Sequence, residues 1–201
     1  MTVRAILFAT AMTLVAGTSA ALAQAPSPKL RGTIESVAGN VVTVKTLDGR
    51  DVAVTLAPDA KVLGVKPFSV DQIKPGSYIG SAALPQPDGT LKALEVLVFP
   101  PAMAGSGEGH YPWDLAPGSS MTNATVGDVM TAGGRMMTVH YKGGEQRITV
   151  GDGVPVMTME PSDRSLLTPG THVFMAPMPG ADGTMMAGFV AAGENGAVPP
   201  M

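Results

Sequence analysis

Four side chains in the second half of this sequence have the chemistry of a copper site. Methionine thioethers are soft ligands that favour Cu(I), and imidazole also binds copper. The chain has 14 methionines, 3 histidines and no cysteine, so a soft metal ion would be bound without thiolates. Copper handling is therefore one hypothesis for function, and its candidate ligands are Met175, Met186, His140 and His172.

A second group of reactive side chains lies in the segment 100–122, which is rich in glycine and proline and contains the stretch GEGHYPWDL. This stretch holds the only tryptophan of the chain. A mere spacer would be polar, so we expect Trp113 to be largely buried against neighbouring structure. The candidate ligand-binding residues of this segment are His110, Tyr111, Trp113 and Asp114.

The same segment offers a weak zinc pattern. Glu108, His110 and Asp114 are of the residue types that bind zinc, and they lie close together in the sequence. The alternative is a docked loop in which the histidine and the aspartate cap the loop's own turns. The pattern favours the docked loop.

The sequence contains no set of residues typical of an enzyme. Covalent hydrolysis needs a nucleophile, a base and an orienting group, but G-x-S-x-G, H-E-x-x-H and S-x-x-K motifs do not occur. No phosphate-binding loop occurs either. The net charge of −3 and the scattered basic residues disfavour nucleic acid as a partner. We therefore expect no catalytic residues and, apart from the copper alternative, no cofactor.

The elements that carry these residues are predicted by an internal match. At an offset of 94 positions, the segments 54–96 and 148–190 are identical at 12 of 43 positions. The matches include both Pro-Gly pairs, at Pro75-Gly76 and Pro169-Gly170, and both Asp-Gly-Thr runs. This similarity predicts a tandem duplication of one structural unit.

Each unit is expected to be a small β-barrel. In the first unit, β-rich segments cover 32–37, 41–46, 51–56, 78–84 and 90–99, with a short helical turn before Pro75-Gly76. Three strands, a helical turn and two strands are typical of the five-stranded OB barrel. The predicted fold is all-β with short helical turns, in two tandem five-stranded OB-like barrels. The expected divisions are a signal peptide at 1–23, a first barrel at 29–99, a connector at 100–122, a second barrel at 123–192 and a flexible tail at 193–201.

The internal match also gives an alternative to copper for the methionines. Most of them align with aliphatic residues of the first unit, as Met157 does with Leu63, which predicts core packing. Met175 and Met186 are the exceptions, because they align with the polar residues Ser81 and Lys92.

The first 23 residues have the layout of a secretory signal peptide. A short basic start is followed by an apolar run, and Ala21-Leu22-Ala23 fits a cleavage site. The apolar run is too short for a membrane-spanning helix. We expect a periplasmic or secreted protein that is cleaved near Ala23 and has no membrane span in the mature chain.

The GEGHYPWDL stretch and the pattern I-K-P-G…P-x-P-D-G-T-L-x-A at 73–93 resemble exported bacterial proteins with an uncharacterised OB-like domain of unknown function. The resemblance covers essentially the whole mature chain. The second half departs from it, with Leu-Thr-Pro-Gly for the first motif and Met185-Met186 after Asp-Gly-Thr. The resemblance implies an OB-like barrel and brings no reaction or ligand. The sequence thus favours an exported non-enzymatic protein that binds an envelope protein, a peptide or a glycan.

Overall fold

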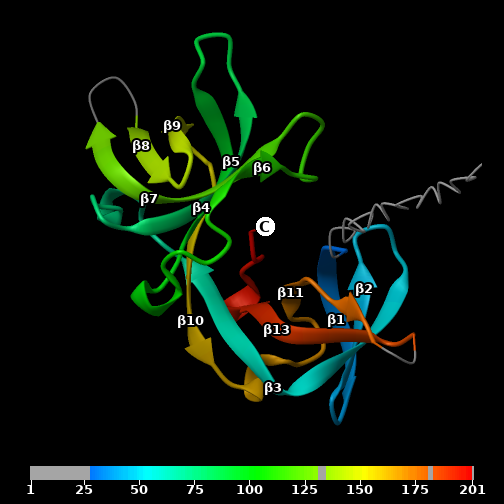
Figure 1. Cartoon of the computed structure of the whole chain (residues 1–201). Helices are drawn as coiled ribbons and strands as arrows, with labels where there is room; N and C mark the ends of the chain where they lie inside the picture. The colour runs from blue at the N-terminus through cyan, green and yellow to red at the C-terminus, as the bar shows by residue number, and fades with distance from the viewer. Residues whose placement is uncertain (1–27, 131–134, 181–182, 201) are drawn as a thin grey trace, which may run out of the picture.

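The computed structural model describes residues 28–130, 135–180 and 183–200, and the predicted signal peptide lies outside them. The described chain is built almost entirely of β-strands, with short 3-10 turns between them. Figure 1 shows two barrels side by side, joined by the long strand β3 (Asp51–Pro67) and by β10 (Val156–Ser162). The predicted class, all-β with two five-stranded OB-like barrels, is confirmed.

One barrel is formed by the two ends of the chain, and we call it the terminal barrel. Its hydrogen-bonded ring runs β1–β2–β3–β13–β11 and closes from β11 back to β1. The β3–β13 pair is parallel and the others are antiparallel, as in an OB barrel. Besides β3, its strands are β1 (Leu30–Ala38), β2 (Val41–Thr46), β11 (His172–Met175) and β13 (Met185–Gly193).

The other barrel lies within a continuous stretch of sequence, and we call it the middle barrel. Its ring runs β7–β8–β9–β5–β4 and closes from β4 back to β7, with β5 and β9 parallel. Its strands are β4 (Tyr78–Pro85), β5 (Leu91–Val98), β7 (Ser120–Met130), β8 (Arg135–Tyr141) and β9 (Gly144–Val150).

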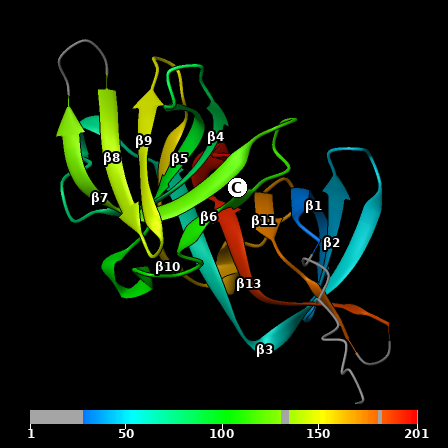
Figure 2. The same cartoon turned by 45° about the horizontal axis from the view of Figure 1, so that its top comes forward.

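The strand pairing therefore corrects the expected division of the chain into complete barrels at 29–99 and 123–192. The strands β1, β2 and β3 of the first half close on β11 and β13, whereas β4 and β5 close on β7, β8 and β9. Figure 2 shows this exchange as red and orange strands beside blue ones in the terminal barrel, and green beside yellow in the middle barrel. Each barrel takes three strands from one half of the chain and two from the other.

The length of β3 is the physical reason for the exchange. We expected a strand at 51–56, but the strand continues through a register shift beside Pro58 and on to Pro67. Proline is tolerated at such irregularities, and the apolar run Val62–Val65 continues the strand beyond it. The extension pairs with β13 as far as Val65 and with β10 as far as Pro67, and β4 then begins beside β7.

Three buried clusters fill this architecture. One lies inside the terminal barrel and one inside the middle barrel. The third lies between the barrels, and its buried members are Leu63, Val65, Leu97, Met159, Phe174 and Ala191. The barrels are thus packed against each other through an apolar junction.

Two further segments lie at this junction. The connector forms β6 (Gly109–Pro112), which pairs with β7. The segment 193–201 was expected to be a flexible tail, but Glu194–Gly196 forms a 3-10 turn, and Pro199 and Pro200 are buried. In Figure 1 the C-terminal end lies between the barrels. Apolar residues near the end of the chain explain why this segment docks.

Candidate ligand-binding site between the barrels

A cavity lined by Tyr111 and Trp113 opens between the terminal barrel and the connector. Its volume is about 720 Å³, within the range of small-molecule pockets. Its lining is mostly apolar and includes five aromatic side chains, Phe99, Tyr111, Trp113, Phe174 and Phe189. A concave apolar site at the junction of two packed units is a common position for a ligand.

The terminal barrel supplies one wall of this pocket. Phe174 on β11 and Phe189 on β13 come from paired strands, and their ring centroids are 6.3 Å apart. Lys61 on β3 is the register partner of Phe189. Lys29 immediately precedes β1. This strand pairs with β11 on the edge of β11 that does not pair with β13. The strand order therefore places a lysine on either side of two phenylalanines.

The connector supplies the opposite wall. Because side chains alternate along a strand, Tyr111 and Trp113 share one side of the β6 segment, and both line the pocket. Their ring centroids are 6.0 Å apart. Asn123 on β7 donates a hydrogen bond of 2.8 Å to the Tyr111 hydroxyl. Burial raises the pKa of Tyr111, so this hydroxyl stays neutral at physiological pH.

Trp113 connects this wall to the terminal barrel. The Lys29 Nζ atom lies 3.5 Å from the centre of its ring, a cation–π contact. Trp113 is half-buried, so its packing against the barrel is confirmed and its burial is less complete than expected. Its Nε1 atom is itself buried and has no hydrogen-bond partner in the described structure.

Asp114 fixes the connector by charge. Its carboxylate accepts hydrogen bonds from Arg31 at 2.8 and 3.2 Å and lies 3.4 Å from the Lys29 Nζ atom. The hydrogen bond from Arg31 is the largest cause that lowers the pKa of Asp114. Asp114 therefore binds the connector to the terminal barrel.

Of the four predicted ligand-binding residues, Tyr111 and Trp113 line the pocket, whereas Asp114 does not, and neither does His110. Its Nδ1 atom lies 2.8 Å from the Thr122 hydroxyl, and its ring stacks on Tyr141 at 6.1 Å. Burial lowers the pKa of His110, which favours the neutral imidazole. Because it alternates with Tyr111 along β6, it faces the other side of the strand.

The three residues of the zinc pattern have separate partners. The Glu108 carboxylate accepts a hydrogen bond of 3.0 Å from the Lys142 backbone N–H, while His110 contacts Thr122 and Asp114 pairs with Arg31. Within residues 28–130, 135–180 and 183–200, no group of three or more His, Cys, Asp or Glu side chains could hold a metal ion.

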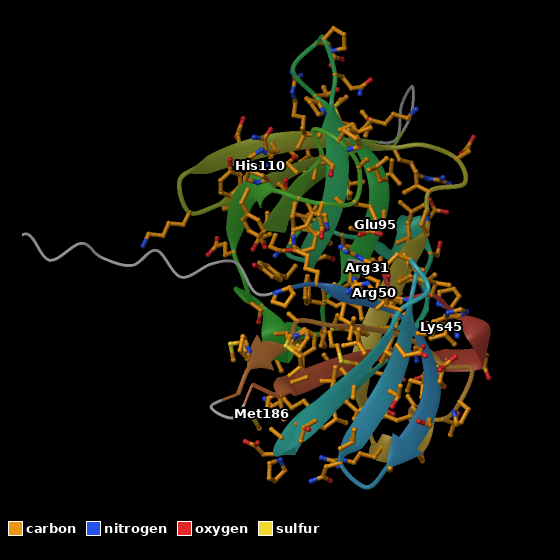
Figure 3. All side chains as sticks on the ribbon, turned by 90° about the vertical axis from the view of Figure 1, so that its right-hand side faces the viewer. Arg31, Lys45, Arg50, Glu95, His110 and Met186 are labelled. Carbon is orange, nitrogen blue, oxygen red and sulfur yellow. The ribbon has the colours of Figure 1, made fainter. Side chains whose placement is uncertain are left out.

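The four candidate copper ligands are divided between the barrels. Met175 is fully buried in the terminal barrel, and the His172 Nδ1 atom lies 3.1 Å from the hydroxyl of Thr33 there. His140 is on β8 of the middle barrel, 3.5 Å from Glu145. Met186 is exposed on β13 of the terminal barrel, as Figure 3 shows. The structure therefore does not bring the four side chains to one point.

The methionines that align with aliphatic residues are largely but not uniformly internal. Met137 and Met159 are buried, as core packing predicts. Met178 is exposed although it aligns with Leu84, and Met175 is buried although it aligns with Ser81. Ser81 is itself fully buried, and its hydroxyl donates a hydrogen bond to the Glu95 carbonyl, so the aligned position is internal in both halves and only the residue type differs.

Sequence reasoning found Tyr111 and Trp113 but missed the lysines that flank the pocket. Lys61 and Phe189 are 128 positions apart in the sequence and become neighbours only when β13 pairs with β3. No local motif signals this contact. The available signal was the alternation of outward-facing residues along each strand, which becomes informative only once the partner strand is known.

In the part of the chain that the structure describes, no helix is long and apolar enough to cross a membrane. Comparisons of the chain with models of protein families, with curated proteins and with solved structures returned no match.

Proposed function

We propose that this protein is an exported, non-enzymatic binding protein that takes a small apolar ligand into the pocket between its two barrels. One observation carries this proposal: a cavity of about 720 Å³ lined by five aromatic side chains at a packed junction. Burial of an apolar ligand against these rings would remove their surfaces from water, which is the main source of affinity in such sites.

The fixed walls of the pocket support binding with little reorganisation. The connector pairs with β7 along β6 and is bound to the terminal barrel through Asp114 and Arg31. A pocket whose walls are held in place before binding loses less entropy when the ligand enters. The resemblance to exported proteins and the signal-like N-terminus support a periplasmic or secreted location, and we attribute the two barrels to duplication of one unit.

The single tryptophan provides the test of binding. Titration with N-phenyl-1-naphthylamine, a neutral apolar fluorophore, should give saturable energy transfer from Trp113. Ala176→Phe should fill the pocket and weaken this binding at least about tenfold, since Ala176 is part of the lining. The matched control is Ala53→Phe, at an exposed position on β3 outside the lining. Absence of saturable transfer, or equal binding by both variants, would overturn the proposal.

Export has its own test. Mass spectrometry of the protein from the envelope of the native cell should show a chain that starts at Gln24. A dominant species that retains residues 1–23 would contradict export with cleavage.

A further inference from the structure

We infer that the ligand of the inter-barrel pocket is an amphipathic anion, with an apolar body and one carboxylate or similar charged group. This inference rests on the proposed binding function and adds the charge of the ligand. The apolar body is either an acyl chain or an aromatic ring system, since both bury well against aromatic side chains.

The charge of the lining is the first observation. The side chains that line the pocket include two lysines and no carboxylate, although the whole chain carries a net charge of −3. An acidic protein that lines its apolar pocket with cations alone is complementary to an anion.

Lys61 is the second observation. It is exposed on β3, and no ion pair or hydrogen bond joins it to another residue that the structure describes. By contrast, Lys29, Lys45 and Lys66 each lie within 4.0 Å of a carboxylate. Lys61 is therefore available to a ligand at the edge of the pocket beside Phe189.

Trp113 is the third observation. Its ring lines the pocket, and its buried Nε1 donor has no acceptor among the described residues. A buried N–H group without an acceptor is unfavourable until a partner is supplied. A ligand oxygen at this end of the pocket would be a suitable acceptor, beside Lys29, which lies over the same ring.

The positions of these groups define how the ligand lies. Phe174 and Phe189 are between the two lysines in the order of the strands. An apolar body that rests on the two rings can therefore place a terminal anion near either lysine. Lys61 is the better partner, because Asp114 already neutralises part of the Lys29 charge.

The test compares ligands that differ only in the charged group. Displacement of N-phenyl-1-naphthylamine is measured for decanoate and decyltrimethylammonium below their micellar concentrations and for 1-decanol below its solubility limit. We expect decanoate to bind about 5- to 10-fold more tightly than decanol, because of one charge-assisted contact. 1-Naphthaleneacetate and the corresponding neutral alcohol, 2-(1-naphthyl)ethanol, form the aromatic arm. Preference for the anion in either arm supports the inference. The arm that shows the preference identifies the type of apolar body.

Variants assign the preference to Lys61. Lys61→Gln should remove most of the preference for the carboxylate, and Lys61→Arg should keep it. Lys92→Gln, at an exposed position outside the lining, should change nothing. If alcohol and carboxylate bind equally in both arms, the inference is wrong while the proposed binding function stands. If the neutral fluorophore itself does not bind, the proposed function fails first.

Discussion

Lys66 and Glu160 form an ion pair across the two strands that connect the barrels, with 2.7 Å between the Lys66 Nζ and Glu160 Oε1 atoms. The two residues lie 94 positions apart, which is the offset of the internal sequence match, and β3 and β10 pair antiparallel around Val65 and Met159. If the proposed duplication is correct, these are corresponding positions that now carry opposite charges. If positions 66 and 160 both carried lysine, or both carried glutamate, like charges would lie side by side.

Reversal of one charge tests this relationship. Lys66→Glu should lower the Tm by about 1–3 °C, since both side chains are exposed and such pairs contribute little. The double variant Lys66→Glu/Glu160→Lys should recover the loss. Thermal unfolding measures both, and a double variant that is less stable than the single one would contradict the pairing.

The exchange of strands predicts that the two halves of a cut chain stay together. A protease site inserted in the turn Leu115–Gly118, between β6 and β7, should be cleaved in the folded protein. Each barrel contains strands from both fragments, so the fragments should elute together in size-exclusion chromatography and separate only in denaturant. Elution of two separate folded fragments would show that each half closes its own barrel.

The junction between the barrels should stabilise the fold as strongly as a barrel interior. Leu97 is buried in the inter-barrel cluster, so Leu97→Ala should lower the free energy of unfolding by about 2–4 kcal/mol. Leu47→Ala is the matched control, because Leu47 is 85% exposed and its loss should have almost no effect. Urea unfolding gives both values, and equal effects would argue against a packed junction.

Acid should release the connector from the terminal barrel. Hydrogen bonding by Arg31 lowers the pKa of Asp114 below its ordinary value of 3.8. A depressed carboxyl pKa contributes stability above the unfolded pKa, and this contribution is lost as the pH falls through the folded pKa. Trp113 emission should therefore change as the pH falls below 3.8, the ordinary pKa of the carboxyl group. Asp114→Asn should abolish this change; its persistence in that variant would assign it to another carboxylate.

Copper binding should not require the two methionines and two histidines of the candidate set, Met175, Met186, His140 and His172, to act together. Because His140 is on the middle barrel and Met175 is buried in the other, we expect no Cu(I) equivalent that is lost both in His140→Ala and in Met175→Leu. Native mass spectrometry after Cu(I) titration measures this, with Met130→Leu as an exposed control. Loss of one tightly bound equivalent both in His140→Ala and in Met175→Leu, but not in Met130→Leu, would restore the copper hypothesis.

Local patterns in the sequence predicted the strands, but they did not predict which strands meet. The turn at Asp88-Gly89 shows what is local: Gly89 has a φ of +78°, and the Asp88 side chain accepts a hydrogen bond from the Thr90 N–H. The choice of barrel for β4 and β5 is not local, because their partners β7 and β9 lie in the other half of the sequence. For the same reason Tyr111 and Trp113 could be predicted as site residues, whereas Lys61 could not.

The division of strands between the barrels has a consequence for the order in which the protein can fold. The middle barrel is complete once residue 150 is available, whereas the terminal barrel needs β13, which ends at Gly193. A chain that emerges N-terminus first must therefore keep β1 without β11, and β3 without β13, until nearly all of it has been released. The pocket, whose wall includes Phe174 and Phe189, is assembled in that last step. A truncated or stalled chain would thus have a barrel but no binding site.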